Sequence, residues 1–206
     1  MTSGVRHLPG ARGHLDMLER PLAALRADGP RLEAWGRELA AVLLGGGRLL
    51  AAGNGGSASQ ATHLTSELVG RYRSERPPFS AIPLCAESSS LTAIGNDYGI
   101  EELFARQVRG HGRSGDVLVA LSTSGRSANI LAAVDAARGH GVRTWALAGR
   151  PGNPLALRCD DALCVDSADT ATIQEIHLIA IHVLCDAVDE AVLANPPALS
   201  LAGGAA

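Results

Sequence analysis

Two short segments of the 206-residue chain combine small and polar residues in patterns that could do chemistry. The first is Gly53-Asn54-Gly55-Gly56-Ser57, which follows the apolar run 49–52 and precedes a segment of helix-forming residues. A strand that turns through glycines into a helix, here with Ser57 as the expected N-cap, directs free backbone N–H groups at one point. Such a point suits an anion, most often a phosphate.

The second segment is Ser122-Thr123-Ser124-Gly125-Arg126-Ser127, which carries four hydroxyl groups within six residues. It follows the strand expected over 116–121, which is apolar after its first residue. Hydroxyls and helix N-terminal amides can hold a phosphate without a cationic side chain. An ordinary N-cap would need only one of these hydroxyls, so their number favours anion binding. Both segments would lie at the carboxyl ends of parallel strands, where α/β sheets bind ligands, and could serve one site.

His63 and Glu67 follow about two turns into the helix after the first segment. Because they are four residues apart, both lie on one face of that helix. One interpretation is an acid–base or metal-binding pair beside the anion site. The alternative is a solvated pair on the helix surface.

Polar residues also interrupt an apolar helix expected over 170–193, and buried polar groups need partners, so this face should look onto something polar. Spacing alone leaves the choice of residues open. Gln174 and His182 lie about 80° apart around a helix, whereas Glu175 and His182 are better aligned. His177 and His182 are about 140° apart and cannot easily serve one site, and a lone helix histidine is more often structural than catalytic.

The elements that would position these residues alternate along the chain. Helices are expected over 15–27, with a kink or restart at Pro21, and over 32–44, after a break at Gly29-Pro30. Strands 49–52, 80–84, 116–121, 143–148 and 162–165 then alternate with helices 57–68, 88–94, 101–108, 127–138 and 170–193. This alternation predicts an α/β fold with a five-stranded parallel sheet and helices on both faces.

A single domain is expected over residues 14–195, with N-terminal helices in 14–45 and the α/β core in 48–195. Residues 1–13 are expected to be loose, and residues 196–206 to form a disordered tail. The N-terminal helices precede the alternating pattern, and their apolar stripes would suit either a partner subunit or their own domain.

Composition limits the function classes. The chain is 46% hydrophobic with a net charge of -3, which allows a sizeable core and argues against nucleic-acid binding. No run approaches the roughly 20 apolar residues of a membrane span, and the N-terminus lacks the apolar core of a signal peptide. Cys85, Cys159, Cys164 and Cys185 lack a zinc or redox spacing and are expected to be buried or free thiols of a cytoplasmic protein.

Five motifs occur in an order and spacing that resemble bacterial phosphoheptose isomerases, members of the sugar isomerase (SIS) domain family: GNGGSASQATHLTSEL, GRYR, IGNDYG, LSTSGRSANIL and IQEIHLIAIH. The resemblance covers about residues 35–193. It implies a flavodoxin-like sheet and a homotetramer with active sites at subunit interfaces. It also implies interconversion of sedoheptulose 7-phosphate and D-glycero-D-manno-heptose 7-phosphate through an enediol.

The resemblance assigns a role to each candidate site residue, position by position. It implies a catalytic pair, Glu67 and His182, and one zinc ion per subunit bound by His63, Glu67, Gln174 and His182. It thereby selects Gln174 and His182 where spacing could not. The implied substrate contacts are Asn54, Gly55, Gly56, Ser57, Glu67, Asn96, Asp97, Ser122, Thr123, Ser124, Ser127 and Gln174.

The chemistry is consistent with these residue types. Aldose–ketose isomerisation needs a base such as Glu67 to move a proton between C1 and C2, and His182 could handle hydroxyl protons and ring opening. A zinc ion could polarise the carbonyl, although one Glu67 carboxylate then has two competing roles.

Two departures and two alternatives accompany the resemblance. Residues 58–60 differ from those of many relatives without a clear consequence. Thr172 stands where the relatives usually carry arginine, which removes a charge near the site. The first alternative is a non-catalytic SIS protein resembling the DnaA-initiator-associating protein, which need not keep the acid–base residues that this chain has. The second is an isomerase of another sugar phosphate, because a phosphate cradle does not read sugar stereochemistry.

Overall fold

A computed structural model describes residues 10–195 of the protein. Its sheet has five strands, all parallel, in the order β2-β1-β3-β4-β5. The strands are β1 Leu49–Gly53, β2 Ala81–Pro83, β3 Val117–Ser122, β4 Arg143–Ala148 and β5 Asp161–Cys164. The predicted five-stranded parallel sheet is confirmed.

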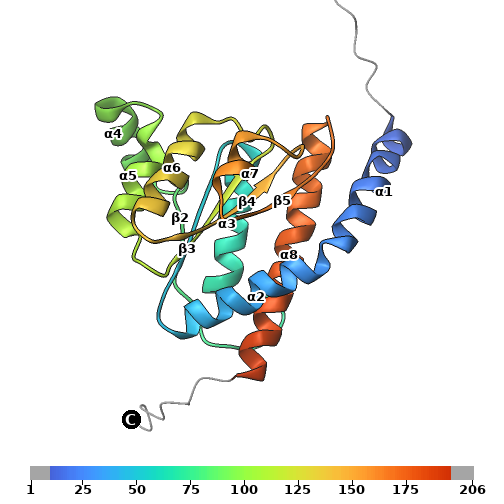
Figure 1. Cartoon of the computed structure of the whole chain (residues 1–206), viewed down its shortest axis with the longest axis horizontal. Coiled ribbons are helices and arrows are strands. Elements are labelled where there is room, and N and C mark those ends of the chain that lie inside the picture. The colour runs from blue at the N-terminus through green and yellow to red at the C-terminus, as the bar shows by residue number, and fades with distance from the viewer. Residues whose placement is uncertain (1–9, 196–206) are drawn as a thin grey trace, which may run out of the picture.

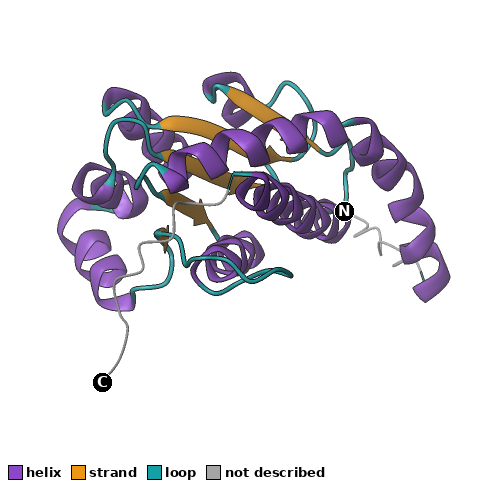
Figure 2. Ribbon diagram, turned by 90° about the horizontal axis from the view of Figure 1, so that it is seen from below, coloured by secondary structure: helices purple, strands orange, loops and turns teal. Residues whose placement is uncertain are grey.

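Helices cover both faces of the sheet, as the alternation predicts (Figure 2). Successive residues of a strand point to opposite faces, so Leu49 and Ala51 enter one core cluster while Leu50 and Ala52 enter the other. The first face carries α1 Ala11–Ala27, α2 Gly29–Leu44, α3 Gly56–Val69 and α8 Thr170–Ala194. The second carries α4 Ser88–Tyr98, α5 Glu102–His111, α6 Ala128–Gly139 and α7 Pro154–Arg158.

The two N-terminal helices attach to the body differently (Figure 1). Helix α2 packs against its own domain along α8, where a Cβ on Gly36 would collide with Ala187. Helix α1 buries only Pro21 and Leu25 and leaves Leu15 63% exposed. The own-domain alternative therefore holds for α2, whereas α1 keeps an exposed apolar stripe.

Several element boundaries differ from the expectation, each for a local reason. Helix α1 begins at Ala11, so residues 11–13 are helical and not loose, and it continues through Pro21 without a restart. An interior proline loses one hydrogen bond and crowds the preceding turn. Pro21 is buried with Leu25 against the body, and this packing favours the continued helix. Helix α4 continues through Gly95 to Tyr98, because an isolated glycine weakens a helix without ending it.

Two further differences concern the helix starts. The N-cap of α3 is Gly55, not Ser57, which lies inside the first turn. Helix α7 is missing from the expectation because its five residues are too few to show a period, although Asn153 caps it through its side chain. The expectations for residues 1–9 and 196–206 lie outside the described residues. Within residues 10–195, no helix combines the length and the apolar character that crossing a membrane requires.

The contact between α2 and α8 generates a prediction about stability. We expect Gly36→Ala to lower the free energy of unfolding by about 1–3 kcal/mol, because the added methyl group meets Ala187 in a closely packed interface. The control is Gly110→Ala in α5, where the methyl group enters open space and should raise stability by roughly 0.5 kcal/mol. Urea denaturation of both variants is the measurement, and equal effects of the two substitutions would contradict the packing explanation.

Candidate active site

The glycine turn after β1 brings the backbone close to two neighbours. A Cβ at Gly53 would collide with the backbone carbonyl of Ser57, so only glycine allows the strand to turn this tightly into α3. Gly55 has a φ of 54°, a conformation that favours glycine. A Cβ at Gly56 would collide with the Gln174 carboxamide, which places that side chain of α8 directly on the turn.

The hydroxyl loop after β3 lies beside this turn, because β1 and β3 are paired with Gly53 opposite Leu121. The Ser122 hydroxyl lies 3.3 Å from that of Ser127 and 3.5 Å from that of Ser124. The loop bends at Gly125, whose φ is 62° and whose N–H donates to the Ser122 hydroxyl. The serine hydroxyls therefore converge at the start of α6, as an anion site requires.

Two asparagines join the glycine turn to the hydroxyl loop. The Asn54 and Asn129 carboxamides exchange two hydrogen bonds, each 2.9 Å long, between the end of β1 and the first turn of α6. Asn129 is absent from the sequence-based set. The available signal was a polar residue within an apolar helix, since Asn129 is only 6% exposed.

A pocket of about 530 Å³ adjoins the hydroxyl loop and is partly lined by Thr123 and Ser124. It also contains Arg126 and Arg150, neither of which was a candidate site residue. Arg150 is paired with Asp166 at 3.7 Å on the exposed surface. Asp166 offsets the charge of Arg150, so Arg126 is the neighbour that adds positive potential beside the hydroxyls.

Acid–base side chains from α3 and α8 meet about two turns along α3 from the glycine turn. The His63 Nε2 atom lies 3.0 Å from His182 Nε2 and 3.3 Å from Glu67 Oε1. The Glu67 side chain is 20% exposed, so it is largely withdrawn from water. Tyr72, another residue missing from the candidate set, stacks on the His182 ring with centroids 5.6 Å apart, and burial raises the pKa of its hydroxyl.

Three of the four expected zinc ligands are thus in contact, whereas Gln174 lies against Gly56. Two imidazole nitrogens and a carboxylate oxygen suit zinc chemically. Ligands about 2.1 Å from a tetrahedral ion lie roughly 3.4 Å apart, close to the distances measured from His63. As the side chains stand, however, no three histidine, cysteine or carboxylate groups in the described part of the chain form a metal-binding cluster.

The remaining expected contacts are placed as follows. Ser57 is 3% exposed in the first turn of α3. Asn96 and Asp97, expected in a loop, lie on the exposed surface of α4, where the Asn96 amide donates to the Asp97 carboxylate at 2.8 Å. Thr172 is fully buried, and within residues 10–195 its hydroxyl has no hydrogen-bond partner. That position therefore faces the interior and is not open to solvent.

His177, which lies about 140° around α8 from His182, has a structural role next to the hydroxyl loop. It is fully buried, and its Nε2–H donates to the Ala148 carbonyl at the end of β4, 3.1 Å away. A Cβ on the next residue, Gly149, would collide with the Thr123 carbonyl. Burial lowers the pKa of His177 to about 4, so the ring is neutral near pH 7.

Comparisons with known proteins agree with this arrangement. The SIS domain family matches residues 16–149. The phosphoheptose isomerase of Streptomyces coelicolor is 61% identical over 198 residues, which is 96% of this chain and 86% of that protein. The phosphoheptose isomerase of Thiobacillus denitrificans is 50% identical, over 84% of this chain and 89% of that one.

Solved structures give the same result. The phosphoheptose isomerase structures from Neisseria gonorrhoeae and Francisella tularensis superpose with TM-scores of 0.80 and 0.82. Their sequence identities to this chain are 39% and 35%, and each alignment covers 87% of this chain and 96% of the other.

The buried histidine generates a prediction about pH. Below pH 6.5 the unfolded chain protonates His177, but the folded chain does not until about pH 4, so the free energy of unfolding should fall between these values. We expect His177→Gln, which keeps a donor for the Ala148 carbonyl, to show a smaller fall. Urea denaturation of both proteins from pH 7.5 to pH 4 gives their free energies of unfolding. If these fall in parallel, His177 does not cause the pH dependence.

Proposed function

Because the chain belongs to the SIS domain family, and within it to the phosphoheptose isomerases, we propose that it converts sedoheptulose 7-phosphate to D-glycero-D-manno-heptose 7-phosphate. Family membership makes it a sugar-phosphate isomerase. One observation carries the proposed mechanism: Glu67 and His182, on helices far apart in sequence, are linked through His63 within 3.3 Å. The hydroxyl loop supplies a place for the phosphate of the same substrate.

The proposed reaction is a proton transfer between neighbouring carbons. The Glu67 carboxylate removes the proton from one carbon and returns it to the other, through an enediol. His182 exchanges protons with the sugar hydroxyls and assists ring opening. Stacking of Tyr72 on His182 restricts rotation of the imidazole, which keeps it oriented toward the substrate.

The phosphate of the substrate is proposed to lie at Ser122, Thr123, Ser124 and Ser127, with Arg126 and Arg150 nearby. Asn54, Gly55, Gly56, Ser57 and Gln174 would line the sugar, with Asn96 and Asp97 closing from α4. The rise of an α-helix puts His63 roughly 10 Å along α3 from Gly56. That separation leaves room for a sugar chain between the glycine turn and the acid–base group.

We also propose one zinc ion per subunit, held by His63, Glu67, Gln174 and His182. When bound, it would polarise the substrate carbonyl as a Lewis acid. The donor types and the separations at His63 support the proposal. Gln174 would have to turn away from Gly56 to take part.

The proposed assembly is a homotetramer with active sites at subunit interfaces. The exposed leucines of α1, Leu15 at 63% and Leu22 at 42%, support a partner subunit on this helix. A cytoplasmic location is proposed as well, and the four cysteine thiols, all free, are consistent with it.

The catalytic proposal predicts the effect of two substitutions. We expect the purified protein to isomerise sedoheptulose 7-phosphate, and Glu67→Gln and His182→Ala each to reduce kcat by at least about 100-fold, because each removes an acid–base group. Circular dichroism should show an unchanged fold.

Matched controls are Glu33→Gln in α2 and His140→Ala at the end of α6. Both side chains are exposed and are not among the proposed site residues, so the activity of each variant should match the wild type. Full activity of Glu67→Gln and His182→Ala would refute the mechanism. Turnover of a different sugar phosphate alone would support the other isomerase. No turnover combined with tight binding to a replication initiator would support the non-catalytic alternative.

The zinc proposal predicts metal content. Protein purified without chelator should contain about one zinc ion per chain by elemental analysis, and His63→Ala should contain far less because it loses a nitrogen ligand. His111→Ala, an exposed histidine on α5, is the control and should keep its metal. A metal-free protein whose full activity resists chelators would remove the zinc proposal.

A further inference from the structure

A buried ion pair lies just beyond the acid–base group. The Arg76 Nε atom donates to Asp189 Oδ1 at 2.8 Å, and their side chains are only 1% and 4% exposed. Arg76 comes from the segment after α3, and Asp189 from the last third of α8. Buried charges are costly unless they are paired and fully hydrogen-bonded, so the remaining donors and acceptors of this pair matter.

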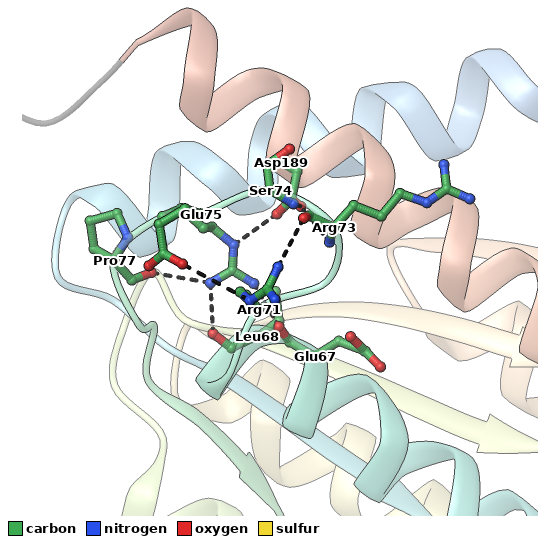
Figure 3. Close-up of polar contacts among 9 residues, drawn as sticks. Glu67, Leu68, Arg71, Arg73, Ser74, Glu75, Pro77 and Asp189 are labelled. Carbon is green, nitrogen blue, oxygen red and sulfur yellow. Dashed lines mark hydrogen bonds and ion pairs between the residues drawn. The ribbon is translucent and has the colours of Figure 1, made fainter.

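Two of the other Arg76 hydrogen bonds go to the end of α3, and a third runs from Nη1 to the Pro77 carbonyl at 3.1 Å. Nη2 donates to the Glu67 carbonyl at 2.6 Å and Nη1 to the Leu68 carbonyl at 2.9 Å. The last carbonyls of a helix have no partner within the helix, so the guanidinium caps α3. Figure 3 shows the Glu67 side chain extending away from this cluster while its backbone lies within it. Arg76 therefore holds the backbone of Glu67, the residue proposed as the catalytic base, by donating to its carbonyl.

Asp189 ties two further parts of the site to the same cluster. Its Oδ2 atom accepts from the backbone N–H groups of Arg73 and Ser74, which fixes the segment that carries Tyr72. Tyr72 in turn stacks on His182. His182 and Asp189 are seven residues apart on α8 and therefore lie on nearly the same face of that helix.

We propose that Arg76 and Asp189 are positioning residues for the isomerisation. The pair holds α3 and α8 at one separation and register, so that the Glu67 carboxylate and the His182 imidazole keep a fixed distance from the same substrate. This inference rests on the proposed function. It assigns catalytic geometry to a pair outside the proposed substrate and metal contacts. Such a pair can matter because a displacement of about 1 Å can cost roughly 100-fold in rate.

The alternative is that the pair only stabilises the fold, and the energetics of buried ion pairs provide the test. Removing one partner strands a buried charge, whereas replacing both by apolar residues of similar volume is often neutral. We therefore expect the double variant Arg76→Met with Asp189→Leu to lose less stability than either single substitution, because it strands no buried charge. Its kcat should fall at least tenfold, because the Glu67 carbonyl loses its donor, while KM changes less than threefold because the hydroxyl loop is untouched.

A second variant covers the case in which the double variant does not fold. Arg76→Lys keeps the charge opposite Asp189 but cannot reach both helix carbonyls with a fork, so it should show the same loss of kcat at nearly constant KM. Arg143→Lys is the control, because Arg143 pairs with Glu38 on the exposed surface at 3.2 Å, and its kcat should be unchanged.

Steady-state kinetics with sedoheptulose 7-phosphate and thermal unfolding are measured on all variants together with Glu67→Gln. A folded double variant, or a folded Arg76→Lys, with wild-type kcat would overturn the positioning role while leaving the proposed function intact if Glu67→Gln is inactive. An active Glu67→Gln, or a wild type without turnover, would instead refute the proposed function and, with it, this inference.

Discussion

The close contact between α3 and α8 is the constraint on which the site depends. Three contacts along the helices form it. The Gln174 carboxamide lies against Gly56, and the Gln60 amide donates to the Gln174 carbonyl at 2.5 Å. The third is the contact between the His63 and His182 rings. Further along, Arg76 and Asp189 lock the two helices together. Helices this close need small residues or specific polar contacts between them, and both are present.

The same contact explains why the glycines and the polar residues occur together. Glycine at 56 lets α8 approach the turn, and the carboxamide pair of Asn54 and Asn129 then fixes the neighbouring hydroxyl loop. His177 donates to the Ala148 carbonyl at the end of β4, which pairs with Ser122 at the start of that loop. The hydroxyl loop and the acid–base group are thus set by packing around α8, although they arise from separate segments of the chain.

Most of the fold could be predicted from the sequence, because alternating apolar runs report burial directly. The strands and the two faces of helices follow from that alternation, and α8 from its long apolar run. The elements that escaped prediction are governed by weaker signals. Helix α7 is shorter than two turns, and the continuation of α1 through Pro21 and of α4 through Gly95 depends on tertiary packing or on small propensity differences.

The sequence by itself determined which residues could do chemistry: the hydroxyls of 122–127, the glycine turn, and His63 with Glu67 on one helix face. It could not choose among Gln174, Glu175, His177 and His182, because spacing around one helix does not say which face meets α3. Tertiary structure decided this by bringing His182 to His63, and it added Tyr72, Arg76 and Asn129. Tyr72 and Asn129 contact residues more than 70 positions away along the chain, and Arg76 contacts Glu67 across a loop. No local sequence pattern encodes such pairing.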